Sequence, residues 1–138
     1  MMYKLGPTSR KRLIGLKPAL IAIVERAIEL SKIDFAVIEG LRTAARQEEL
    51  YAKGRTTPGP KVTWTLWSKH LLGDAVDLAP FIDGKIDWTP GDNFDLIAIA
   101  MYAAAEELET RVRWGADWDQ DGIPRERGET DSPHWELP

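Results

Sequence analysis

The chain has 138 residues, a formal net charge of −4 and no cysteine. This length fits one domain with a sizeable core, and the lack of cysteine excludes disulfides, thiolate metal sites and cysteine nucleophiles. The acidic balance argues against a nucleic-acid-binding protein, because such domains usually carry a basic face. No apolar stretch reaches the roughly 18 residues that a membrane span needs, so we expect no membrane insertion.

Hydrophobic periodicity and turn residues predict the elements in chain order. The first half is expected to hold a helix capped by Thr8 or Ser9 and ending near 16, a helix over 18–31, a strand over 34–40, a helix over 44–53 capped by Thr43, and a loop over 55–69. The second half is expected to hold a strand over 74–79, a hairpin turned at Asp83-Gly84, a helix over 92–109, a strand over 111–114, a loop over 115–132 and a strand over 134–137.

Helices and strands are partly segregated along the chain, which favours an α+β fold with a small, mainly antiparallel sheet and flanking helices. Trp88 and Trp114 are expected in its core. Trp64 and Trp67 precede His70 in the long loop. We expect them to pack, and the alternative is that they wall a ligand groove beside His70.

The two histidines are the first candidate site residues: His70 in SKHLLGDAVD and His134 in TDSPHWEL. A catalytic zinc site takes three protein ligands and keeps a fourth position for water, so an acid must complete the set here. Asp77 is the natural candidate, because Gly73 permits a tight turn between His70 and the strand that carries Asp77. Both histidines are read as lying at acid-flanked strand edges. The alternative is a surface histidine at 70 and a hydrogen-bonded turn residue at 77.

Two acids flank His134. Asp131, three residues before it, is placed to accept a proton from metal-bound water and pass it to a leaving amine, or else it caps a loop. Glu136, two residues after it, shares its face of a regular strand. It either orients the ligand histidine or is a partly exposed strand acid.

Together these segments resemble the LAS metallopeptidases, a group named for lysostaphin, D-alanyl-D-alanine peptidases and sonic hedgehog. SKHLLGDAVDLAP matches the histidine–aspartate motif of the group, and TDSPHWEL matches its acid-x-x-His motif. EGLRTAARQEELYAKGRTTPG resembles its arginine-bearing segment. WGADWDQDG followed by DSPHWEL is similar to phage L-alanyl-D-glutamate endopeptidases, small endolysins that cut the stem peptide of peptidoglycan.

The resemblance implies a LAS/hedgehog-type fold and a set of zinc ligands: His70, Asp77 and His134. It implies that Asp131 is the general base and that Ser68 lies near the substrate. Arg42 matches the arginine that polarises the scissile carbonyl and stabilises the oxyanion, although by position alone it is also a surface arginine at a helix start.

The expected function is therefore a zinc-dependent L-alanyl-D-glutamate endopeptidase that acts as an endolysin. The rivals are a D-alanyl-D-alanine carboxypeptidase or dipeptidase and, from another class, a non-catalytic wall-binding module. We expect a single peptidase domain over 1–138, without a separate wall-binding domain, and a monomer. The N-terminus shows no signal-peptide core. Synthesis in the host cytoplasm, release through a partner such as a holin, and action on the wall in the periplasm are expected.

A second ion site is suggested by DWDQDG, which places Asp117, Asp119 and Asp121 at alternate positions before Gly122. The spacing fits the first half of an EF-hand calcium loop. The twelfth position is Gly128 rather than glutamate, and the nearest acids are out of register. We expect calcium to order this loop and thereby promote activity; the alternative is a solvated acidic turn.

Overall fold

The computed structural model describes residues 2–61, 63, 65, 66 and 68–138, so Trp64 and Trp67 lie outside the described residues. The helices are α1 (Pro7–Leu13), α2 (Pro18–Leu30), α3 (Ala44–Ala52) and α4 (Asp92–Glu107), with a short 3₁₀ helix η1 (Lys69–Leu72). The strands are β1 (Phe35–Glu39), β2 (Ala75–Ile82), β3 (Lys85–Ile86), β4 (Arg113–Trp114) and β5 (His134–Glu136).

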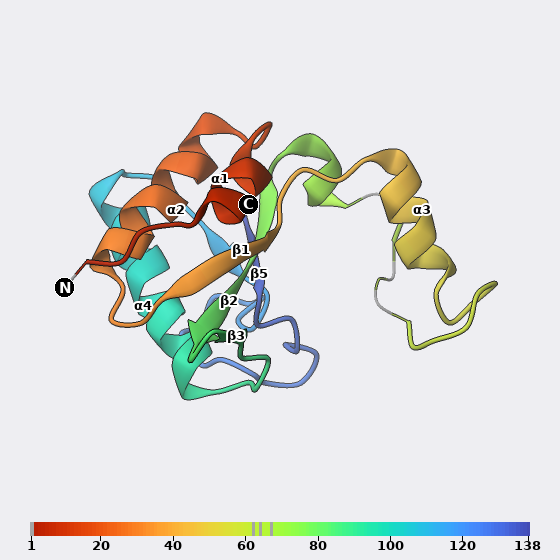
Figure 1. The fold of residues 1–138 in the computed structure, drawn as a ribbon. Helices are drawn as coiled ribbons and strands as arrows, with labels where there is room; N and C mark the ends of the chain where they lie inside the picture. Colours follow the sequence, from red (N-terminus) through yellow and green to blue (C-terminus); the bar gives the residue numbers. More distant parts are fainter. Residues whose placement is uncertain (1, 62, 64, 67) are drawn as a thin grey trace.

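The strands form one small antiparallel sheet in the order β1-β2-β5-β4, with β3 as a hairpin partner of β2 (Figure 1). The predicted α+β class with an antiparallel sheet is confirmed. Strand β2 is central, since it pairs with β1 on one side and with β5 on the other. Asp83 and Gly84 both have positive φ in the predicted hairpin turn, as a two-residue turn of this kind requires.

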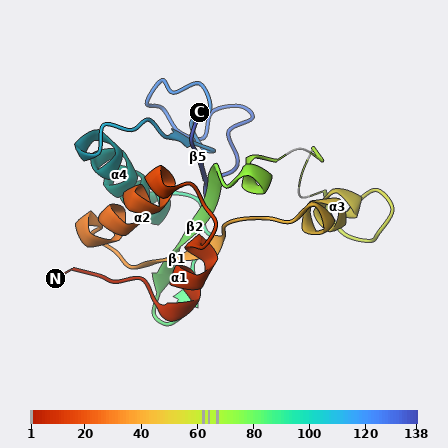
Figure 2. The same ribbon diagram turned by 90° about the horizontal axis from the view of Figure 1, so that it is seen from above.

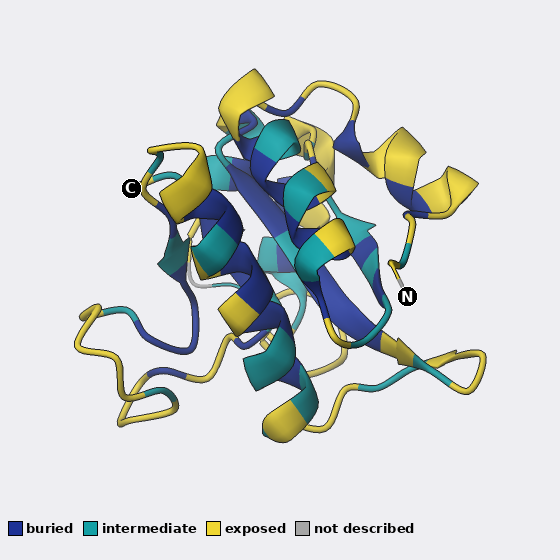
Figure 3. Cartoon of the chain, turned by 90° about the vertical axis from the view of Figure 1, so that its left-hand side faces the viewer, coloured by how far each residue is buried: buried dark blue, intermediate teal, exposed yellow. Residues whose placement is uncertain are grey.

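Helices α2 and α4 lie side by side over one face of the sheet, and the buried residues gather between these layers (Figure 3). Because side chains alternate along a strand, Val76 and Leu78 of β2 face these helices and Asp77 faces the opposite side. Val76 and Leu78 are fully buried. The sheet therefore has one core face and one face free to carry polar side chains.

Helix α3 stands apart from the sheet in both views (Figures 1 and 2). Its predicted cap is confirmed, because the Thr43 side chain accepts a hydrogen bond of 3.1 Å from the Arg46 amide. The first helix differs from its prediction: Gly6 is the N-cap and Pro7 opens the helix. The Ser9 hydroxyl is instead buried and accepts a hydrogen bond from the Val37 amide of β1.

Two further predictions were wrong. Trp88 is 55% exposed, because it lies in the irregular segment between β3 and α4, whereas Trp114 is buried as expected. His70 lies on η1 rather than at a strand edge, since Ser68 caps a 3₁₀ turn that closes at Gly73. Among the described residues, no helix is long and apolar enough to cross a membrane.

We expect Leu78→Ala to lower the free energy of unfolding by about 2–5 kcal/mol, because it leaves a cavity between β2 and the helices. Urea denaturation of the metal-free protein measures this loss. Phe81→Ala on the same strand is the control and should cost less, since Phe81 is 40% exposed. Equal losses at the two positions would contradict the assignment of Leu78 to the core face.

Candidate metal centre and active site

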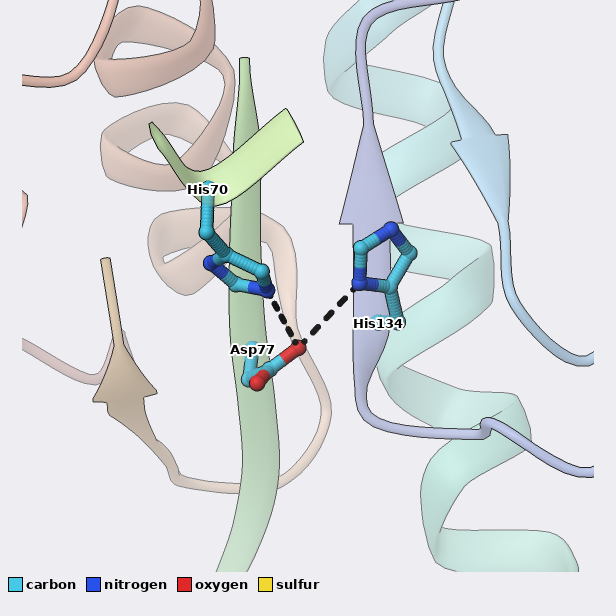
Figure 4. Close-up of side chains that lie close together, drawn as sticks. All are labelled: His70, Asp77 and His134. Carbon is cyan, nitrogen blue, oxygen red and sulfur yellow. Dashed lines mark ion pairs between the residues drawn. The ribbon is translucent and has the colours of Figure 1, made fainter. Parts of the chain in front are cut away.

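The structure brings His70, Asp77 and His134 together from three elements (Figure 4). One oxygen of the Asp77 carboxylate, Oδ1, lies 3.3 Å from His70 Nε2 and 3.4 Å from His134 Nδ1. Both histidines are buried, and Asp77 is 20% exposed at its side chain. The three predicted ligands thus form one compact cluster on the polar face of the sheet.

Backbone geometry explains why these side chains meet. Asp77 on β2 is directly opposite His134 on β5 in the antiparallel register, so the two side chains share a face. His70 reaches the same point because Gly73, with φ of +75°, ends η1 in a left-handed conformation and returns the chain to β2. Gly73 also accepts a backbone hydrogen bond from Lys17, which fixes the turn against the start of α2.

In each imidazole, the ring nitrogen that does not face Asp77 has a hydrogen-bond acceptor. His70 Nδ1 donates to the Gly40 carbonyl oxygen at 2.9 Å, and His134 Nε2 donates to Glu136 Oε1 at 2.8 Å. Because a carbonyl and a carboxylate only accept, these nitrogens carry the protons. His70 Nε2 and His134 Nδ1 are left to offer lone pairs to a metal ion.

The donor set fits a catalytic metal ion. Two imidazole nitrogens and one carboxylate oxygen lie within 4.8 Å of one another, and nitrogen and carboxylate ligands suit zinc when no thiolate is present. All three residues line a cavity of about 580 Å³, so a fourth position is open to water or substrate.

Without metal, the cluster is electrostatically polarised. Burial opposes ionisation of Asp77, but hydrogen bonds from His134 and His70 outweigh it and hold the pKa of that carboxyl well below its usual range. Burial lowers the pKa of His134, but its bonds to Asp77 and Glu136 dominate and raise it to about 9. For Glu136, burial is likewise outweighed by His134 and Arg113, and the pKa falls to about 2.

Arg42 is held at the edge of the cluster and is not a surface residue, since its side chain is 8% exposed. Its Nε and Nη2 donate to the two oxygens of Glu39 at 3.0 and 2.9 Å. Its Nη1 donates to Gln47 Oε1 at 2.7 Å, and Nη2 lies 3.9 Å from Asp77 Oδ2. The guanidinium is thus fixed beside the cluster of His70, Asp77 and His134.

Gln47 and Glu39 are site residues that sequence reasoning missed. Gln47 is fully buried although it is polar, and its amide donates to the Thr65 carbonyl and the Thr63 hydroxyl. It therefore ties α3 and the segment beside it to Arg42. Burial was the missing signal, because a glutamine on an exposed helix has the same appearance in sequence.

Asp131 lies at the mouth of the cluster. Its side chain is 54% exposed, and its Oδ2 is 4.0 Å from His134 Nδ1. Burial of the carboxyl and the charge of Asp77 raise its pKa, against the opposing influence of His134, His70 and Arg42. Gly115 makes the approach possible, since a Cβ there would collide with the Asp131 carbonyl oxygen.

Ser68 combines two roles in the structure. Its hydroxyl accepts a hydrogen bond from the His70 amide at 3.2 Å, which caps η1, and it lines the cavity. The cavity wall also includes Lys69, Arg113 and Trp118, none of which the sequence singled out. The Trp118 ring is 5.5 Å from the His134 ring.

The acidic loop, residues 115–130, brings together more carboxylates than the three that fit the EF-hand spacing. Asp117, Asp119 and Asp121 come within metal-binding distance of one another, and Asp119 also groups with Glu126 and Glu129. These two glutamates are out of register for an EF-hand, but the loop folds back and brings them in. Asp117 is buried, and its Oδ1 has no hydrogen-bond partner among the residues that the structure describes.

The carboxylates of this loop repel one another. Burial, with Asp119 and Asp121, raises the pKa of Asp117 despite a hydrogen bond from the Gly122 amide. The hydrogen bond with the Asp121 carboxylate is the main cause that raises the pKa of Glu126 to about 7, and loss of solvent contact adds to it. A bound cation would relieve this repulsion.

Two imidazoles, a carboxylate, a nearby half-exposed acid and a fixed arginine around one cavity are typical of a metal-dependent hydrolase. The sequence profile described as phage L-alanyl-D-glutamate peptidase matches residues 1–138. The chain is 39% identical over 141 residues to the L-alanyl-D-glutamate peptidase of Escherichia phage T5, covering 99% of each protein. It therefore belongs to the phage L-alanyl-D-glutamate peptidase family.

Bacterial proteins are similar as well. The peptidoglycan L-alanyl-D-glutamate endopeptidase CwlK of Bacillus subtilis is 34% identical over 98 residues, which cover 62% of this chain and 54% of CwlK. The crystal structure of the Serratia marcescens L-Ala D-Glu endopeptidase ChiX superimposes with a TM-score of 0.79 at 32% identity, covering 100% of this chain and 90% of ChiX.

The pKa shifts predict a pH-dependent stability of the metal-free protein. The raised pKa of His134 stabilises the fold fully below its unfolded value of 6.5, and this contribution is lost as pH rises towards about 9. The lowered pKa values of Asp77 and Glu136 stabilise above their unfolded values of 3.8 and 4.5, and this contribution is lost in acid.

Thermal unfolding in a chelator should therefore give a melting temperature that falls between about pH 6.5 and 9. Zinc is the control, because metal binding needs a neutral imidazole and its stabilisation should grow over the same range. A metal-free melting temperature that stays constant across this range would contradict the charged His134 cluster.

Proposed function

We propose that this protein is a zinc-dependent endopeptidase that hydrolyses the L-alanyl-D-glutamate bond of the peptidoglycan stem peptide. The observation that carries the proposal is the convergence of His70, Asp77 and His134 on one cavity, in a chain that matches the family over residues 1–138. The names of the relatives all specify the L-alanyl-D-glutamate bond, which favours it over a D-alanyl-D-alanine carboxypeptidase and over a non-catalytic wall-binding module.

The finer fold class that we assign is the LAS/hedgehog type, with one peptidase domain over 1–138. Support comes from the antiparallel sheet, which carries Asp77 and His134 on adjacent strands, and from the similarity to ChiX. We further propose a monomer that acts on the wall in the periplasm, released by a partner such as a holin. The phage origin of one close relative supports this setting.

Zinc held by His70, Asp77 and His134 would lower the pKa of a bound water to about 7 and polarise a carbonyl. The residues of the chain do the rest. Asp131 accepts the proton of the attacking water and returns it to the leaving amine, and its raised pKa makes it a better base than an ordinary aspartate.

Arg42 is assigned to the developing oxyanion. Glu39 and Gln47 fix the guanidinium before substrate arrives, so no reorganisation is needed when charge develops on the carbonyl oxygen. A donor fixed in this way is worth roughly 3 kcal/mol of transition-state stabilisation. Ser68, on the cavity wall, is assigned to substrate contact.

Mass spectrometry of purified peptidoglycan after digestion tests the reaction. We expect new L-alanine C-termini and D-glutamate N-termini, abolished by a chelator and restored by zinc. Asp131→Asn should keep the fold and the bound zinc and lower turnover by about 10²–10⁴-fold, because it removes the base. His70→Ala is the matched control, since it should lose zinc as well as activity.

Release of terminal D-alanine instead would contradict the assigned bond. Full activity of Asp131→Asn would contradict the role of the base and favour a module that only binds the wall.

We also propose that Asp117, Asp119 and Asp121 bind calcium and that the ion promotes activity. The buried Asp117 oxygen without a partner supports a cation here. The loop leads directly to the base: Glu129 accepts hydrogen bonds from the Asp119 and Glu126 amides two residues before Asp131. Ordering of this loop would fix Asp131 relative to His134.

Calcium titration of the zinc-loaded enzyme tests this link. Activity of the wild type should rise with calcium, and Asp119→Asn with Asp121→Asn should abolish the rise, because two ligands lose their charge. The control is Glu25→Gln with Glu106→Gln, which removes the same charge at exposed positions outside the loop. An identical calcium response in the Asp119/Asp121 variant would refute the site.

A further inference from the structure

Glu136 is a buried carboxylate beside the proposed metal centre that contacts three basic side chains. It is 5% exposed and accepts a hydrogen bond from His134 Nε2 at 2.8 Å. Its other oxygen, Oε2, accepts one from Arg113 Nη2 at 2.6 Å and lies 3.4 Å from Lys69 Nζ. The three basic partners lie on β5, β4 and the start of η1, so this one side chain joins three elements.

The contact with His134 is on the opposite edge of the ring from the proposed metal. Asp77 faces Nδ1 and Glu136 faces Nε2, so the imidazole is held at both nitrogens. Regular strand geometry produces this arrangement, because residues two apart on β5 project to the same face. The proton on Nε2 is fixed by an acceptor, and Nδ1 is turned towards Asp77 and the position proposed for the metal ion.

Glu136 is also connected to the other histidine ligand. Lys69, which it contacts, directly precedes His70 and donates from Nζ to the Leu137 carbonyl oxygen at 2.6 Å. The segments that carry His70 and His134 are thus connected through Lys69 and the end of β5. The separation of the two ligands is set by the protein before any ion binds.

Burying a carboxylate is costly unless its charge is compensated. Arg113 and Lys69 compensate it here, and the Arg113 guanidinium is further held over the Trp118 ring at 5.5 Å. Arg113 lies opposite Glu136 in the β4–β5 register, so the ion pair forms wherever these strands pair. The ion pair with Arg113 uses only Oε2 of Glu136. The contact of Oε1 with His134 is therefore a separate interaction.

We propose that Glu136 is a positioning residue for the metal centre: it fixes the orientation and tautomer of His134 and thereby raises the affinity of the site for zinc. The inference rests on the proposed zinc-dependent function and adds a residue outside the ligand set. Hydrogen-bonded partners of ligand histidines typically contribute 10–100-fold to metal affinity.

Zinc affinity, measured by competition with a chromogenic chelator in the absence of peptide, tests the proposal. We expect Glu136→Gln and Glu136→Leu to bind zinc about 10–100-fold more weakly than the wild type. Leucine should have the larger effect, because glutamine keeps an acceptor oxygen for Nε2. Saturating zinc should restore most of the peptidase activity of Glu136→Gln, since the residue acts on the ion and not on substrate.

Glu107→Gln is the matched control, because it removes one carboxylate and one arginine pair, with Arg26, on an exposed part of α4. Its zinc affinity should equal that of the wild type. If Glu136→Leu does not fold, Glu136→Gln decides the question.

Wild-type zinc affinity in a folded Glu136→Gln or Glu136→Leu variant would overturn the proposal and leave Glu136 a purely structural residue. That result would leave the zinc-dependent function standing, because the wild type would still bind zinc and cleave. Absence of zinc binding by the wild type would instead overturn the metal centre itself and this inference with it.

Discussion

One charged side chain, Asp77, constrains the arrangement of the rest of the polar face. It lies on the central strand β2, where both neighbours along the strand point into the core. A carboxylate in that position is tolerable only with compensating partners, and His70 and His134 supply them. The 3₁₀ turn places His70 beside Asp77, and the strand register places His134 there. Both features therefore stabilise the same buried charge.

The remaining charges around the cavity are arranged in pairs. Glu39 holds Arg42, and Glu136 holds Arg113 beside Lys69. With both histidines neutral, as metal binding requires, four carboxylates outnumber three cations among the described lining residues, so a divalent ion reverses the formal charge of the cavity. The negative charge of the cavity favours binding of a cation. With the cation bound, the positive charge favours a substrate that develops negative charge.

The segment from Asp131 to His134 directly follows the acidic loop that carries Asp117, Asp119 and Asp121. Glu129 is buried within that loop, and Gly115 packs against Asp131 so closely that no side chain fits between them. Trp114 donates to the Ser132 carbonyl oxygen, which fixes the chain between Asp131 and His134. These contacts hold Asp131 against Gly115 and keep the following residue, Ser132, beside Trp114.

The sequence by itself determined the local features, because their causes are local. The helix from Pro18, the Thr43 cap, the Asp83-Gly84 turn and the outward side of Asp77 follow from propensity, capping and alternation. The two histidines and their acids could be selected because ligand chemistry restricts the choice of residue type.

Only the tertiary structure decided which side chains share a space. The burial of Gln47 beside Arg42, and the junction of Glu136 with Arg113 and Lys69, join residues remote in the chain. Trp88 was assigned to the core from its type alone, yet it lies exposed. Burial and strand register are set by the packing of the whole chain, and periodicity within one segment carries no information about its partner.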